Sequence, residues 1–185
     1  WHNENIIFDN IIIESRLFDD VWWGKAEPIY VTAYKRKSLN HKDSNLRFAK
    51  GQTEGKVGKV SNIKFSNINC KSENGIFIGG EADKINNIKF NNVQLEISKT
   101  TKYKGNLYDL RPSDTIGLLE TEISGFYFDT AQKISINNCS VFWGKNIAKY
   151  YKFAIYANNI PHLTIENFKG QSAKENLEPI FINNS

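Results

Sequence analysis

The hexapeptide Ile63-Lys64-Phe65-Ser66-Asn67-Ile68 is one of five copies of a single pattern, and Asn takes the fifth place in every copy. The other copies are residues 6–11, 88–93, 134–139 and 163–168. Apolar and polar positions alternate, which is typical of a half-buried strand. Asn tolerates left-handed backbone angles and can hydrogen-bond locally, so it suits a sharp bend. Five bent strands of one kind predict a stacked architecture rather than a layered globule.

A second, shorter apolar strand follows each copy. These strands are residues 28–31, 75–78, 125–128, 153–156 and 179–182, and four of them open with Pro or Gly. The step from Ile63 to Ile88 is 25 residues, which is one compact turn of a solenoid, and the longer steps must loop out. The pattern predicts an all-β fold, a right-handed single-stranded parallel β-helix in which equivalent residues stack about 4.8 Å apart. Phe65 should lie over Phe90, and Asn67 over Asn92.

An antiparallel sandwich is the alternative fold. Hairpin folds, however, have no reason to place Asn at one offset five times. The length of 185 residues predicts one domain over residues 1–185, with a continuous core. A hydrophobic content of 40% and a charged content of 24% argue against disorder.

Charge and hydropathy predict neither a nucleic-acid partner nor a membrane partner. No apolar run approaches the roughly 20 residues that span a membrane, and no signal-peptide pattern is present. The net charge is a mild +4. The one dense basic run, Lys35-Arg36-Lys37, is typical of a solvated loop, and no nucleic-acid motif accompanies it.

The sequence predicts no cofactor. Cys70 and Cys139 take different places relative to the Asn bend, so free buried thiols are expected rather than a disulfide. The two Cys and the three His (His2, His41 and His162) lack metal-ligand spacing. Gly79-Gly80-Glu81 is expected to be a turn after a strand and not a phosphate loop. No Ser-centred nucleophile motif occurs either.

The chain contains no Met and places Trp1 directly before a repeat strand. We therefore expect a processed or cut piece with further coils upstream. An uncapped first coil would expose unpaired backbone groups and apolar stack residues, which predicts self-association at that end.

Several phrases resemble the C-terminal part of family 28 glycoside hydrolases, the polygalacturonase and rhamnogalacturonase group of the pectin-lyase-like superfamily. The similarity runs over nearly the whole chain, and its most specific phrases resemble bacterial polysaccharide-utilisation members. The phrases are Asn5-Ile6-Ile7-Phe8-Asp9-Asn10-Ile11, Trp22-Trp23-Gly24-Lys25-Ala26-Glu27-Pro28-Ile29, Val60-Ser61-Asn62-Ile63-Lys64-Phe65-Ser66-Asn67-Ile68, Ser72-Glu73-Asn74-Gly75-Ile76, Tyr108-Asp109-Leu110-Arg111-Pro112 and Leu163-Thr164-Ile165-Glu166-Asn167-Phe168-Lys169-Gly170.

The resemblance implies a β-helix that hydrolyses acidic pectic polysaccharide with inversion, in the extracellular space or the bacterial periplasm. Inversion needs a carboxylic acid and a carboxylate about 6.5–9.5 Å apart. The family takes its site from Asn-Thr-Asp, Asp-Asp, Gly-His-Gly and Arg-Ile-Lys motifs. None of them occurs here in family context. We therefore expect no catalytic residue in this chain, and we expect the piece alone to be inactive.

Five residues are predicted to contact substrate. By resemblance, Tyr34 corresponds to a sugar-facing Tyr after a Pro-Ile-x-Val strand, although it could equally end that strand. Trp22 and Trp23 could stack on sugars, and Lys25 could pair with a uronate carboxylate beside Glu27. The alternative makes the Trp pair a clamp that closes the loop, with Lys25 and Glu27 as a surface pair.

Two groups of charged residues, Asp19-Asp20 and Asp109 with Arg111, could have either a functional or a structural role. Asp19-Asp20 could raise each other's pKa for acid catalysis, but neighbours in a strand point to opposite faces, which favours a solvated turn. Asp109 and Arg111 are expected to form a structural pair that holds their loop, with ligand contact as the alternative. For the whole chain, a non-catalytic carbohydrate-binding or structural β-helix module is the alternative to a hydrolase part.

Overall fold

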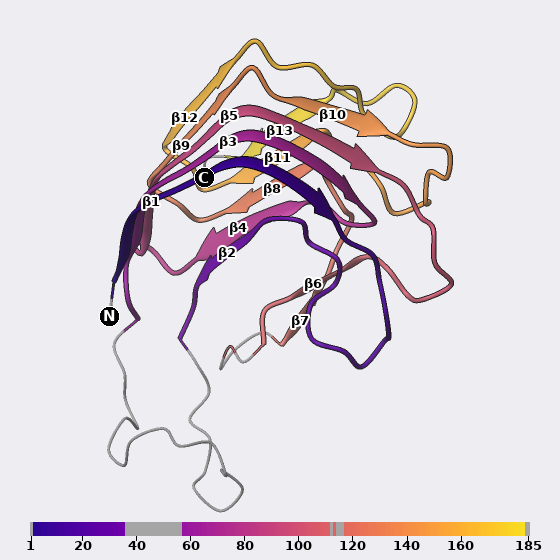
Figure 1. Cartoon of the computed structure of the whole chain (residues 1–185), viewed down its shortest axis with the longest axis horizontal. Helices are drawn as coiled ribbons and strands as arrows, with labels where there is room; N and C mark the ends of the chain where they lie inside the picture. Colours follow the sequence, from indigo (N-terminus) through magenta and orange to yellow (C-terminus); the bar gives the residue numbers. More distant parts are fainter. Residues whose placement is uncertain (1, 36–56, 112, 114–116, 184–185) are drawn as a thin grey trace, which may run out of the picture.

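A computed structural model describes residues 2–35, 57–111, 113 and 117–183, and these form strands and loops without a helix (Figure 1). The first sheet holds, in spatial order, β1 (Asn3–Glu14), β3 (Val60–Ser72), β5 (Ile85–Ile97), β9 (Lys133–Asn137) and β12 (His162–Glu166), with β10 (Ser140–Trp143) beside β5. The second sheet holds β2 (Tyr30–Ala33), β4 (Ile76–Gly80), β8 (Phe126–Asp129), β11 (Ile155–Asn158) and β13 (Ile180–Asn183). A small third sheet pairs β6 (Leu107–Asp109) with β7 (Leu118–Glu120).

The described chain passes back and forth between the two large sheets. Within each sheet the strands follow chain order, and every neighbouring pair in these two sheets is parallel. Only β6 and β7 are antiparallel among the described pairs. The antiparallel sandwich is therefore wrong, and the chain is an all-β protein built on parallel sheets.

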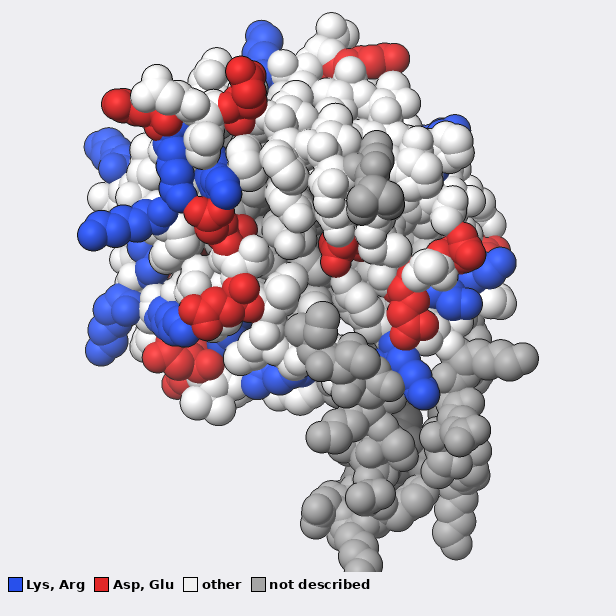
Figure 2. Space-filling view, turned by 180° about the vertical axis from the view of Figure 1, so that it is seen from behind, with Lys and Arg blue, Asp and Glu red and all other residues white. Residues whose placement is uncertain are grey.

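The pairing register brings equivalent positions of the repeat into columns. Phe8 pairs with Phe65, and Phe65 pairs with Phe90, as the repeat predicts. Their rings stack with centroids 5.2 Å apart at each step. Outward positions of the same strands carry polar residues such as Lys64 and Lys89, which are exposed. On the face shown in Figure 2, Lys and Arg are interspersed with Asp and Glu.

The five repeat Asn residues all have a positive φ, between 49° and 58°. β1, β3 and β5 continue through the bend, whereas β9 and β12 end one residue before it. The Asn92 amide nitrogen donates to the Asn67 side-chain oxygen at 2.8 Å. The structure also reveals a second column that sequence analysis missed. Asn5, Asn62 and Asn87 have φ values of 59°, 56° and 55°, and their amides bond from one strand to the next.

Replacing Asn67 with alanine is expected to cost about 2 kcal/mol of unfolding free energy, because alanine disfavours the left-handed backbone and removes the ladder bonds. Urea unfolding measures the change. Asn69→Ala, at an exposed position of the same strand, is the control and should cost less than about 0.5 kcal/mol. Equal losses at both positions would contradict a specific role for the bend.

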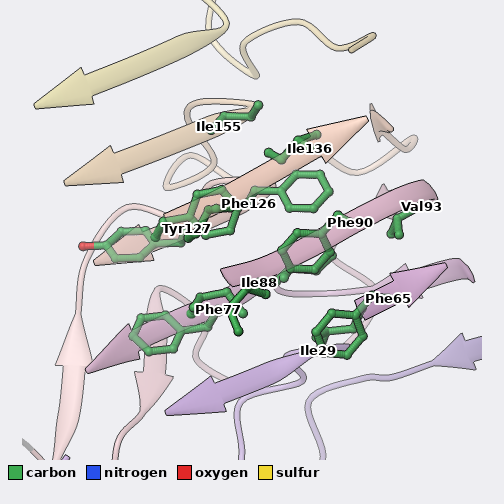
Figure 3. Packing of buried hydrophobic residues seen from close by; sticks show 14 of the residues in the cluster. Ile29, Phe65, Phe77, Ile88, Phe90, Val93, Phe126, Tyr127, Ile136 and Ile155 are labelled. Atoms are coloured by element: carbon green, nitrogen blue, oxygen red, sulfur yellow. The ribbon is translucent and has the colours of Figure 1, made fainter. Parts of the chain in front are cut away.

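The hydrophobic core lies between the two large sheets (Figure 3). Phe90 of β5 meets Phe126 of β8 edge to face, with ring centroids 5.3 Å apart. Both side chains are almost completely buried. Cys70 and Cys139 are buried free thiols, as predicted, and burial raises the pKa of Cys70 to about 12.

One end of the core is open. Phe8 of β1 is 41% exposed, whereas Phe65 and Phe90 in the same column are 5% and 1% exposed. A cavity of about 470 Å³ opens there, lined by apolar residues of both sheets that include Phe8 and Val31. The sequence predicted this exposure of apolar stack residues beside β1.

Candidate functional site

Most of the predicted site residues lie on the loop of residues 15–29, which joins β1 to β2. In Figure 1 this loop lies beside β6 and β7. The Gly24 N–H donates to the Asp109 carboxylate at 2.6 Å, and the Asp109 N–H donates to the Glu27 carboxylate at 2.9 Å. Two segments that are far apart in sequence therefore support one surface.

Three aromatic side chains, Phe18, Trp22 and Trp23, form what we call the aromatic platform. They are exposed by 64%, 63% and 62%, respectively. Phe18 meets Trp22 edge to face at 6.2 Å, and the Arg111 guanidinium lies 5.3 Å from the Trp23 ring centroid. A clamp that buries either Trp against the sheets is therefore wrong, because both rings leave most of their area in solvent.

Lys25 supports the loop from inside. It is 1% exposed, and its ammonium donates to the backbone oxygens of Asp20 at 2.8 Å and Trp22 at 3.2 Å. The expected surface pair of Lys25 with Glu27 is wrong, because the ammonium faces carbonyls of its own loop. The same position turns it away from any uronate carboxylate at the surface.

The Glu27 carboxylate also stabilises the loop of residues 15–29. Its second oxygen accepts the Lys25 N–H at 2.6 Å, so both oxygens bind backbone donors. Burial raises the pKa of Glu27, and the negative charge of Asp109 adds to this effect, while the donated N–H groups oppose it. Glu27 therefore links the loop to β6 and does not extend toward a ligand.

Asp109 and Arg111 form the structural pair that the sequence predicted. The Arg111 guanidinium binds both Asp109 oxygens, at 2.8 and 2.7 Å, and also donates to the Trp22 carbonyl at 2.8 Å. Burial opposes ionisation of Asp109, but the donors from Arg111 and Gly24 lower its pKa. The pair thus remains charged and fastens the platform loop to the β6 segment.

Sequence analysis missed a further support, Asn74. Its buried amide donates to the carbonyls of Lys25 at 2.9 Å and Leu107 at 2.8 Å. The Tyr30 hydroxyl also donates to the Asp109 carbonyl at 2.5 Å. Nothing in the sequence marks Asn74 for this role, because both partners are backbone groups brought close only by the fold.

Tyr34 lies apart from the platform, beyond the opposite end of β2. It is half-buried, and its hydroxyl lies over Gly79, where a Cβ would come within 2.6 Å of it. Burial raises the pKa of Tyr34, and Asp129 adds to the shift. The turn expected at Gly79-Gly80 is wrong: both are the last residues of β4, and Gly79 leaves room for the Tyr34 and Phe77 side chains.

Asp19 and Asp20 occupy a solvated bend, as their structural alternative predicted. Both are exposed. An Asp19 oxygen accepts the Val21 N–H at 2.8 Å, and an Asp20 oxygen accepts the Lys104 N–H at 2.9 Å. The two carboxylates therefore shape the rim of the platform.

Some residues named in the sequence analysis cannot be placed in the structure. Trp1, Arg36, Lys37, His41 and Pro112 lie outside the described residues. Within the described ranges, no three His, Cys, Asp or Glu side chains gather as a metal site would require. No helix long and apolar enough for a membrane span occurs in those ranges either.

The chain was compared with protein-family models, with curated proteins and with solved structures. None of the three comparisons gives a significant match.

Proposed function

We propose that the two large parallel sheets are two walls of one right-handed parallel β-helix. Three observations support this: the chain visits the sheets alternately, equivalent residues pair in register, and Asn bends recur in columns. In such a coil each repeat covers the core of its neighbour.

Within that architecture, the chain is the C-terminal portion of a polysaccharide-degrading glycoside hydrolase of the pectic, inverting type, located outside the cytoplasm. Its own part is to bind polysaccharide, and the catalytic carboxylates belong to coils outside this chain. A non-catalytic carbohydrate-binding or structural module is the alternative, and it would use the same surface.

The observation that carries the binding role is the exposure of Trp22 and Trp23 on a firmly held loop. Exposed large aromatic groups are costly for a protein unless they bind something. Here the loop is fixed by Lys25, Asp109 and Arg111, so the rings are presented in place before binding. A preorganised surface loses less entropy when a ligand binds.

Removing both indoles tests the role. Trp22→Ala combined with Trp23→Ala should weaken binding of pectic oligosaccharides at least about tenfold in isothermal titration calorimetry. Phe142→Ala removes another exposed aromatic, 54% exposed and on β10, and should leave the affinity unchanged. Equal affinity of wild type and the Trp double variant would refute the proposal.

The placement of the catalytic groups has a separate test. The chain alone should release no new reducing ends from polygalacturonate or rhamnogalacturonan. Around the platform, Glu27 and Asp109 are engaged by backbone and Arg111 donors, which leaves neither free to act on a glycosidic oxygen. Measurable turnover would contradict this placement.

A further inference from the structure

We infer that the aromatic platform takes an uncharged sugar, such as a neutral unit of a pectic polysaccharide, and disfavours a polyuronate. The inference rests on the proposed glycan-binding function and concerns the class of sugar at this site. It follows from the charges that surround Phe18, Trp22 and Trp23.

The rim of the platform is acidic. Asp19 and Asp20 are exposed and stand between Phe18 and Trp22 in the chain. One Asp19 oxygen accepts the Val21 N–H, and one Asp20 oxygen accepts the Lys104 N–H. Like charges near each other in a partly aqueous setting cost about 1 kcal/mol or more, so a uronate carboxylate at this rim would be repelled.

Among the described residues, three cations that contact or neighbour the platform loop are engaged by other groups. The Lys25 ammonium is buried against carbonyls, and Arg111 holds both Asp109 oxygens and the Trp22 carbonyl. The Lys104 ammonium lies 3.3 Å from Glu120. Arg16 is exposed on the same loop and precedes Trp22 by six residues in the chain.

The platform itself is suited to apolar sugar faces. Trp22 and Trp23 leave most of their area in solvent, and aromatic faces bind the apolar side of a sugar ring. Shape and charge together favour a neutral ring.

The test compares a neutral galactan oligosaccharide with an oligogalacturonate of equal length. Calorimetry on the wild-type chain at low salt should show about fivefold to tenfold tighter binding of the neutral sugar. Asp19→Asn combined with Asp20→Asn keeps an oxygen acceptor at each position but removes the charge. This double variant should narrow the preference to about twofold, because oligogalacturonate should then bind more tightly.

The outcomes separate this inference from the proposed function. Tighter binding of oligogalacturonate, or an unchanged preference in the double Asn variant, would overturn the inference and keep the glycan-binding role. No binding of either sugar would overturn both. Dimerisation that Trp22→Ala with Trp23→Ala abolishes would show a second copy as the occupant and would also overturn both.

Discussion

Replacing Phe90 with alanine is expected to lower the free energy of unfolding by about 3–5 kcal/mol, a large share of the stability of a single domain. Phe90 is 1% exposed and contacts Phe65 in its own sheet and Phe126 in the opposite sheet. Alanine would leave a cavity where both sheets meet. The Phe65 and Phe126 rings would also lose contact area.

Urea unfolding of wild type and variant measures this loss. Phe8→Ala is the matched control, since it removes the same side chain from the same column at the open end, where Phe8 is 41% exposed. Its cost should stay below about 1.5 kcal/mol. Equal losses of stability in the two variants would contradict a core in which burial increases from Phe8 to Phe90.

Glu73→Gln is expected to cost about 3 kcal/mol, because it removes the charge at the centre of a buried hydrogen-bond cluster. The Glu73 carboxylate accepts N–H groups from Leu17 at 2.6 Å and from Thr100 and Thr101 at 2.5 Å, and Lys99 lies 3.2 Å away. Gln offers one oxygen and places an NH₂ group against donors. The platform loop would lose the hydrogen bond from its Leu17 N–H.

Lowering the pH should protonate the Glu73 carboxylate and destabilise the fold. Burial alone would raise the pKa of Glu73, but the donated N–H groups lower it from 4.5 to about 2. A lowered pKa in the folded state stabilises the fold above pH 4.5, and the gain is lost as the pH falls toward 2. Unfolding followed from pH 6 to pH 2.5 should show this loss in wild type and a flatter profile in Glu73→Gln. Parallel profiles would contradict the assignment.

The repeat made the parallel strands, the Phe column and the five Asn bends predictable. Each depends on a local property, either the alternation of side chains along a strand or the tolerance of Asn for positive φ. The second Asn column was visible in the same way, since Asn5, Asn62 and Asn87 each precede a bend Asn by five residues.

The supports of the platform were less accessible from sequence. Exposure of Trp22 and Trp23 agrees with one of the two alternatives that the sequence left open, and the pair of Asp109 with Arg111 is confirmed. Lys25 was expected at the surface, because sequence shows a charge but not the ring of backbone carbonyls that receives it. Asn74 went unrecognised for the same reason.

NMR titration of the indole N–H signals can show whether Trp22 and Trp23 form a sugar-binding surface. The Trp143 indole N–H donates to the Gln171 carbonyl at 2.7 Å, so it provides an internal reference. Adding a neutral galactan oligosaccharide should shift the Trp22 and Trp23 signals saturably and leave Trp143 in place. Unmoved Trp22 and Trp23 signals, or an equal shift of all three, would contradict the claim.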